Sequence, residues 1–216
     1  MALRVLFVLL LVLPRLAAVS AACAAPATHA SAAAGAADPP GSAGPAAPGT
    51  PPPGSLLDLE GRPADPLKSP DAKLTVFVFV RTDCPISNRY APEIRRLRDA
   101  FSPRGVAFWM IYPDPDEAVA AIKKHLDDYK FGAPGLRDTR HALVKTTGVA
   151  VTPEAAVFQG RTMVYRGRID DRYEDLGKMR PEPATHDLED ALRAALAGKK
   201  VSRRTRAVGC DIPELP

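Results

Sequence analysis

The stretch Val76-Phe-Val-Phe-Val-Arg-Thr-Asp-Cys-Pro-Ile-Ser-Asn88 decides how this chain folds. It opens inside the apolar run Leu74–Val80, whose β-branched and aromatic residues are typical of a strand buried on both faces. A polar loop follows, and apolar residues at helical spacing then predict a helix over Ala91–Phe101, with Pro92 in its first turn. We therefore expect Cys84 to lie between a central strand and the N-terminus of a helix.

Further elements of both kinds alternate along the rest of the chain. They are a strand at Val106–Tyr112, a helix at Asp114–Tyr129, a short helix around Ala142–Lys145 that ends at Gly148, hairpin strands at Glu154–Phe158 and Thr162–Tyr165, and a helix at Thr185–Ala197. Strands separated by helices imply parallel crossovers, and the closing hairpin adds an antiparallel edge. The pattern predicts an α/β protein with a central mixed β-sheet flanked by helices, in the order β-α-β-α-α-β-β-α.

The N-terminus has the layout of a secretory signal peptide over residues 1–22. Arg4 precedes the apolar run Val5–Leu13, and small residues follow. The run is shorter than the roughly 20 residues of a membrane-spanning helix, so an uncleaved anchor is the weaker alternative. Export to the periplasm or cell envelope is predicted. Cys23, directly after small residues, is either a lipid attachment site that tethers the protein to a membrane or an incidental cysteine beside an Ala-x-Ala-like cleavage site.

Composition divides the remainder into three parts. Residues 23–54 are almost wholly Ala, Pro, Gly, Ser and Thr, which predicts a disordered tether. Residues 55–198 are long enough for one compact domain, and residues 199–216 form a basic tail. The formal net charge is a modest +4, and no nucleic-acid motif is visible. The basic tail is either a solvated surface or a site for an acidic partner, and no nucleic-acid partner is predicted.

Cys84 is the candidate nucleophile. A thiolate is the reactive form of cysteine, and a helix N-terminus lowers thiol pKa through its dipole and free N–H groups. Asp83 acts against ionisation, because an adjacent negative charge raises the pKa of a thiol. The alternative is a buried structural cysteine, which would more naturally lie inside an apolar run.

Three segments carry a resemblance to a known family. They are Asp83-Cys-Pro-Ile-Ser87 after the buried strand, Tyr90-Ala-Pro-Glu93 in the helix, and Val151-Thr-Pro153 before a later strand. Over about Ser55–Leu196 the chain resembles the thioredoxin-like superfamily, in its redoxin or alkyl-hydroperoxide-reductase/thiol-specific-antioxidant (AhpC/TSA) branch. The resemblance implies a thioredoxin fold, a protein thiol, disulfide or peroxide as substrate, and an external thiol as reductant.

The resemblance also assigns roles to neighbouring residues. Thr152 and Pro153 match a cis-proline loop that faces the cysteine and aligns an extended substrate, although Pro153 could simply begin a strand. Ser87 stands where a dithiol enzyme has its second cysteine, which excludes a Cys-x-x-Cys site. Its hydroxyl could donate to Cys84 or cap the helix. Thr82 is two residues before the cysteine, where peroxidases of this family have a threonine three before it, and this argues against efficient peroxide reduction.

Cys210 is the candidate partner of Cys84. In an oxidising compartment it could be a resolving cysteine, half of a permanent disulfide, or a free thiol. The neighbouring Arg203, Arg204 and Arg206 would favour its thiolate. We expect a resolving cysteine, and the sequence leaves open whether the tail reaches the Cys84 helix.

Other ligand candidates are weak. Helical histidines such as His125 and His141, and His186 after a predicted cap, are expected to be surface or core residues, so no metal or cofactor is predicted. The charged segment Arg166–Tyr173 is either a salt-bridged loop or a site for an anionic or protein partner. The sequence thus predicts an exported thiol-based oxidoreductase. Its alternatives are a peroxiredoxin-like peroxidase and a non-catalytic redoxin domain that binds a partner protein or metal.

Overall fold

The computed structural model describes residues 55–201 and 204–215. The predicted signal peptide, the tether, Cys23 and Arg203 lie outside these residues. Within them, no helix combines the length and apolar character needed to cross a membrane.

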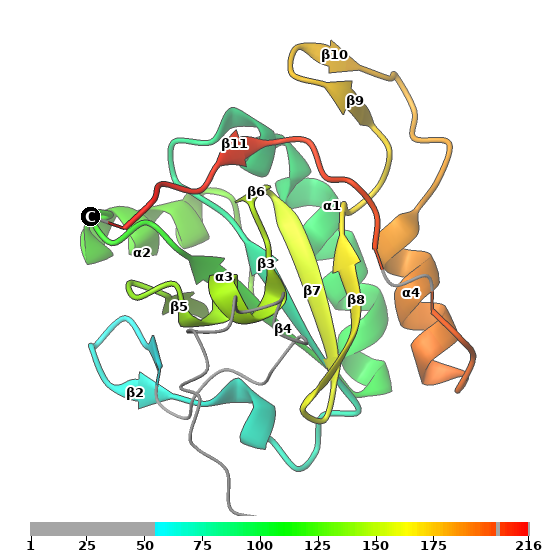
Figure 1. Ribbon diagram of the computed structural model, residues 1–216, viewed down its shortest axis with the longest axis horizontal. Helices are drawn as coiled ribbons and strands as arrows, with labels where there is room; N and C mark the ends of the chain where they lie inside the picture. Colours follow the sequence, from blue (N-terminus) through cyan, green and yellow to red (C-terminus); the bar gives the residue numbers. More distant parts are fainter. Residues whose placement is uncertain (1–54, 202–203, 216) are drawn as a thin grey trace, which may run out of the picture. The chain divides into compact units, whose positions relative to one another are not determined.

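The main sheet is built around β3, the predicted buried strand, whose six residues are all buried. In the described part of the chain, the spatial order of its seven strands is β2 (Pro63–Ala64), β1 (Leu56–Leu57), β5 (Gly135–Arg137), β4 (Val106–Tyr112), β3 (Leu74–Phe79), β7 (Glu154–Gln159) and β8 (Thr162–Gly167). β3 is parallel to β4 and antiparallel to β7, and β7 is antiparallel to β8 (Figure 1). The predicted mixed sheet is confirmed.

Four α-helices and two small sheets complete the described residues. The helices are α1 (Pro85–Phe101), α2 (Val119–Asp128), α3 (Ala142–Thr147) and α4 (Asp187–Leu196), with short 3-10 turns at Pro66–Lys68 and Ser102–Arg104. The small sheets pair β9 (Tyr173–Asp175) with β10 (Lys178–Met179), and β6 (Val151–Thr152) with β11 (Cys210–Asp211). Because β3 and β4 are joined through α1 and the hairpin closes the sheet, this is the predicted thioredoxin fold.

Both faces of the sheet are covered, as expected from the apolar sequence of β3. Val76 and Val78 belong to the hydrophobic cluster that includes α1 and α4, whereas Phe77 and Phe79 belong to the cluster that includes Leu143 of α3. Successive side chains of a strand point to opposite faces, so a strand covered on both sides needs apolar residues at every position.

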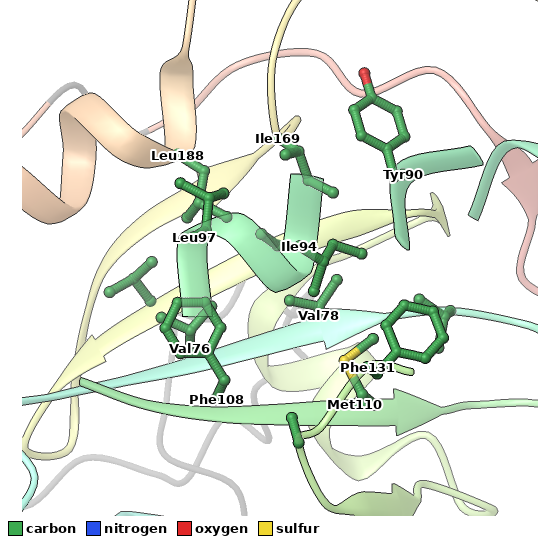
Figure 2. Close-up of a cluster of buried hydrophobic side chains, with 14 of the residues drawn as sticks. Val76, Val78, Tyr90, Ile94, Leu97, Phe108, Met110, Phe131, Ile169 and Leu188 are labelled. Atoms are coloured by element: carbon green, nitrogen blue, oxygen red, sulfur yellow. The ribbon is translucent and has the colours of Figure 1, made fainter. Parts of the chain in front are cut away.

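The core also fixes the helix that carries Cys84. Figure 2 shows Ile94 and Leu97 of α1 lying over Val76 and Val78, with Leu188 of α4 next to Leu97. Each fully buried aliphatic side chain of this kind contributes about 1.5–3 kcal/mol. The packing holds α1 against the sheet and so fixes its N-terminus beside the end of β3.

Several helix starts differ from the sequence prediction. α1 begins at Pro85 rather than Ala91, because Cys84 is the N-cap and Pro85 takes the first position, leaving Pro92 inside the helix. The second helix begins at Val119, since the Asp114 carboxylate makes a turn by accepting the N–H of Asp116 at 2.9 Å.

Two smaller differences concern α4 and β5. α4 is capped by His186, one residue after the predicted Thr185. No strand is predicted at β5 from the sequence, but its three residues, Gly135–Arg137, pair in parallel with β4. A strand of three residues is too short to show a periodic pattern.

Candidate functional site

Cys84 lies at the N-terminus of α1, as predicted. It is the N-cap residue, and its Sγ accepts a hydrogen bond from the Ser87 N–H at 3.4 Å. The Cys84 side chain is 0 % exposed. Ser87 is therefore not the N-cap. The Ser87 backbone N–H donates a hydrogen bond to Cys84 Sγ, and the buried Ser87 hydroxyl has no hydrogen-bond partner among the described residues.

The loop that faces Cys84 is the one named by the family resemblance. The Thr152–Pro153 peptide bond is cis, and the carbonyl oxygen of Thr152 accepts a hydrogen bond from Cys84 Sγ at 3.0 Å. Pro153 lies between β6 and β7 rather than beginning the longer strand. The three predicted residues Cys84, Thr152 and Pro153 thus come together from two segments of the chain.

The C-terminal tail reaches this site. β11 pairs antiparallel with β6 (Figure 1), and this register places Cys210 directly opposite Thr152. Two bonds extend the pairing, from the Ile212 N–H to the Ala150 carbonyl at 3.1 Å and from Arg81 Nη1 to the Asp211 carbonyl at 3.0 Å. Cys84 and Cys210 therefore meet at the same residue, Thr152, and both are free thiols.

Thr205 holds the tail upstream of Cys210. The Thr205 N–H donates to the Arg166 carbonyl at 3.2 Å. The Thr205 hydroxyl lies 2.9 Å from the Tyr165 hydroxyl, and it also accepts a hydrogen bond from the Arg168 N–H at 3.1 Å. A Cβ at Gly167 would lie 2.1 Å from Thr205 Oγ1, so this close contact requires glycine. Sequence reasoning did not identify Thr205, which stands in a polar, basic stretch without a distinctive pattern.

Gly209 permits the same kind of close contact beside Cys210. A Cβ at this position would lie 2.1 Å from the Thr152 carbonyl oxygen. Only a glycine lets the tail backbone come this near to β6. The sequence left open whether the tail reaches the Cys84 helix, and Gly209 was not identified from it.

The pKa of Cys84 lies below its usual value, although burial acts to raise it. The side chains of Cys210, Ser87 and Thr152, which lie beside the sulfur, and the backbone N–H of Ser87 act to lower it. The Thr152 carbonyl acts in the other direction, because it accepts a bond that only the protonated thiol can donate. The net result is a Cys84 pKa below its usual value, so the thiolate forms more easily than in a free cysteine.

The pKa of Cys210 is shifted in the opposite direction, above its usual value. Burial raises its pKa to about 12, and the hydrogen bond and negative charge of Cys84 act in the same direction. The expectation that neighbouring arginines favour a Cys210 thiolate is therefore wrong. Arg204 instead lies beside Arg166 in an isolated β-bridge, and the cation that acts on the Cys210 sulfur is Arg81, distant in sequence.

The Thr82 side chain has another partner. Its hydroxyl donates to Glu117 Oε1 at 2.8 Å, and its N–H donates to the same oxygen at 2.6 Å. Burial raises the pKa of Glu117. The Asp83 carboxylate forms a salt bridge with Arg81 Nη2 at 2.8 Å. The hydroxyl that would have to serve a peroxide is thus committed to a carboxylate.

Two of the histidines are core residues, as expected. His125 Nδ1 lies 2.8 Å from the Tyr112 hydroxyl and its Nε2 lies 2.7 Å from Asn88 Oδ1. Burial lowers the pKa of His125 to about 4. His141 Nε2 donates to the Pro113 carbonyl at 2.8 Å. The two imidazole rings thus form hydrogen bonds with β4 and with the residues next to it.

Comparisons with known proteins identify the family and the fold. The family model described as the AhpC/TSA family matches residues 54–171, and no curated protein matches the chain. A solved structure of an uncharacterized conserved protein from Geobacillus kaustophilus is 26% identical, with a TM-score of 0.66 over 77% of this chain and 91% of that chain.

A second solved structure is a hypothetical protein from Sinorhizobium meliloti 1021. It is 24% identical, with a TM-score of 0.63 over 73% of this chain and 88% of that one, and it shows the fold alone. Because the family match spans more than half of the chain, this thioredoxin-like redoxin domain protein belongs to the AhpC/TSA family.

Proposed function

We propose that the protein is an exported thiol–disulfide oxidoreductase, with Cys84 as the nucleophile and Cys210 as its resolving cysteine. The observation that carries this proposal is the meeting of both thiols at Thr152 with opposite pKa shifts. The thiolate forms more easily at Cys84 than at Cys210, which keeps its proton. This is the division of roles that a nucleophile and its resolving thiol require.

In the first step, the Cys84 thiolate attacks one sulfur of a substrate disulfide. A Cys84–substrate mixed disulfide forms, and the other substrate sulfur leaves as a thiolate that takes up a proton. In the second step, Cys210 loses its proton and attacks Cys84 Sγ. A Cys84–Cys210 disulfide forms and the second substrate sulfur leaves, so the substrate gains two electrons and the protein loses two. An external thiol then restores both cysteines.

The electrostatics favour this order. Cys84 raises the pKa of Cys210 through its hydrogen bond and its charge. Once Cys84 is bound in a mixed disulfide, that charge is gone and both contributions are removed. Cys210 then ionises more easily, which makes it a nucleophile only after the first step.

A substrate can reach Cys84 only when the tail moves. Cys84 is 0 % exposed, and β11 occupies the edge of β6 beside it. Separation of β11 from β6 would free the backbone of Val151 and Thr152 for an extended substrate segment, with Pro153 shaping the loop. The proposed substrate is accordingly a disulfide or dithiol in a polypeptide.

The peroxidase alternative is less favoured because the Thr82 hydroxyl donates to Glu117. A non-catalytic redoxin domain would need no second thiol at the site, whereas Cys210 lies opposite Thr152. Export rests on the sequence of residues 1–22, and tethering rests on Cys23. Cell fractionation and mass spectrometry of the mature N-terminus would test both.

The enzymatic proposal is tested by the reduction of a disulfide-bonded peptide with dithiothreitol as the external thiol. Wild type should turn over, and Cys84→Ser should be inactive. Cys210→Ser should accumulate a mixed disulfide at Cys84 and turn over more slowly. Wild-type activity in Cys84→Ser would refute the proposal, and faster consumption of hydrogen peroxide than of the peptide by wild type would favour the peroxidase.

A further inference from the structure

The loop after β8 carries a carboxylate that this redox chemistry does not use. Asp170 is only 2 % exposed, and its Oδ1 accepts hydrogen bonds from the Tyr90 hydroxyl at 2.5 Å and from the Arg172 N–H at 2.9 Å. Its Oδ2 is buried and has no hydrogen-bond partner. Burying a carboxylate oxygen without a partner is costly, so this atom points to a ligand.

Two further ligand groups lie beside the Asp170 carboxylate. One ligand atom each from Glu93, Asp170 and His186 lies within 4.8 Å of the others. Glu93 is three residues after Tyr90 on α1, and therefore on the same side of the helix. His186 is the exposed N-cap of α4, and its side chain makes no capping hydrogen bond. Figure 2 shows the Tyr90 hydroxyl, which donates to Asp170 Oδ1, pointing away from the sheet.

We propose that Glu93, Asp170 and His186 bind a divalent transition-metal ion, and that this ion is Zn²⁺. Carboxylate oxygens and an imidazole nitrogen are ordinary zinc ligands, and three protein ligands leave a fourth position for water. The imidazole disfavours Mg²⁺ and Ca²⁺, which prefer all-oxygen sites. A dication also offsets the repulsion between two carboxylates held this close together.

The existing contacts of Glu93 are compatible with an ion. Arg96 donates to both carboxylate oxygens of Glu93, at 2.7 and 2.8 Å. Each carboxylate oxygen has two lone pairs, so one on each oxygen is still available to a metal. Arg96 then acts as a second contact that orients the ligand, as neighbouring groups commonly do around metal sites.

The ion would hold three segments together, namely α1, the loop after β8 and the start of α4. Glu93 is nine residues after Cys84 on the same helix, which is about 14 Å at the rise of an α-helix. The ion therefore does not touch the cysteine sulfurs, and its role is to fix the helix whose N-terminus carries Cys84. Zinc binding at this site and thiol–disulfide activity at Cys84 can each be present without the other.

Calorimetric titration of ZnCl₂ into the full chain tests the proposal, with Cys23, Cys84 and Cys210 all replaced by serine. The replacement removes thiolates that would themselves bind zinc. This chain should bind one Zn²⁺. His186→Ala and Glu93→Gln should each weaken binding by about tenfold or more, because even groups that only support a ligand contribute 10–100-fold. His186 is exposed, so its variant is expected to fold.

Glu189→Gln is the matched control. Glu189 pairs with the same Arg96 and also with Arg193, but it is outside the ligand cluster, so its loss should leave zinc affinity unchanged. Co²⁺ bound in place of zinc should give visible absorption without a thiolate charge-transfer band. The proposal is overturned if the thiol-free chain binds no Zn²⁺, or if His186→Ala and Glu93→Gln bind it as tightly as Glu189→Gln does.

Discussion

Cys84 and Cys210 both contact Thr152, and the pKa values of the two thiols are shifted in opposite directions. The cause is local: burial acts on both sulfurs, but only Cys84 collects hydrogen-bond donors from Ser87 and from its partner cysteine. The sulfur at the helix N-terminus is therefore the one of the pair that ionises more easily. Cys210 stabilises the Cys84 thiolate as long as Cys210 keeps its own proton.

Replacing Cys210 should weaken the Cys84 thiolate. Cys210→Ala removes the neighbouring side chain that does most to lower the pKa of Cys84, so that pKa is expected to rise. Titration of the ultraviolet absorbance of the thiolate measures this directly. Asp211→Asn, one residue further along the same strand, serves as the control and should leave the titration unchanged. An unchanged or lower pKa of Cys84 in Cys210→Ala would show that Cys210 is not a donor.

His125 should make the protein sensitive to mild acid. Its pKa is lowered to about 4 by burial, so between pH 6.5 and 4 the unfolded chain binds a proton that the folded chain does not. Stability is lost as pH falls through this window, by up to ~3 kcal/mol. Denaturant unfolding should therefore show the stability advantage of wild type over His125→Gln shrinking on acidification.

Asp138 supplies a control of opposite sign. Burial raises its pKa to about 6, so the folded chain keeps a proton that the unfolded chain releases, and acidification from pH 6 to 4 adds stability. The advantage of wild type over Asp138→Asn should accordingly grow as pH falls. If both variants changed in the same direction, the assignment of these buried groups would be wrong.

At the scale of elements, β11 is the part that must move. It consists of two residues and pairs with an equally short strand, β6. Few backbone bonds hold it, while the helix that carries Cys84 is clamped by a full hydrophobic face. Local opening energies are lowest where buried apolar contacts are fewest. We expect the tail to separate from β6 while α1 and the main sheet stay intact.

Gly209→Ala tests this movement. The added Cβ would meet the Thr152 carbonyl oxygen at 2.1 Å, so the tail must shift away from β6. If the clash costs the docked tail ~1.4 kcal/mol, alkylation of Cys84 should become about tenfold faster. The rate is measured by mass spectrometry after timed exposure to iodoacetamide.

A second glycine controls for a general loss of stability. Gly160 lies in the hairpin turn with a φ of 56°, and a Cβ there would meet nothing within 4 Å. Gly160→Ala should strain the backbone without speeding alkylation of Cys84. Equal acceleration by both substitutions would point to global unfolding rather than to release of the tail.

For the whole molecule, the sequence predicted what depends on local pattern. The buried strand β3, the helix after it and the β7–β8 hairpin all follow from apolar runs, spacing and a Gly turn. The cis peptide at Thr152–Pro153 was expected only through the family resemblance, and the structure has it. These are features that neighbouring residues largely determine.

The features that were missed depend on contacts between distant residues. β5 exists because its three residues pair with β4, and β11 exists because Cys210 pairs with Thr152, 58 residues away. The pKa of Cys210 was misjudged because Arg204 and Arg206 are near it in sequence, whereas Arg81 is the cation that acts on it. Closeness in sequence therefore does not predict which charged side chain lies near the Cys210 sulfur.

The most direct test of the account is peptide mapping of the protein after oxidation by oxidised glutathione. We expect a Cys84–Cys210 cross-link that dithiothreitol opens, and in Cys210→Ser a stable mixed disulfide between glutathione and Cys84. Oxidised protein without the Cys84–Cys210 linkage, with both thiols still free or each carrying its own glutathione, would contradict the account.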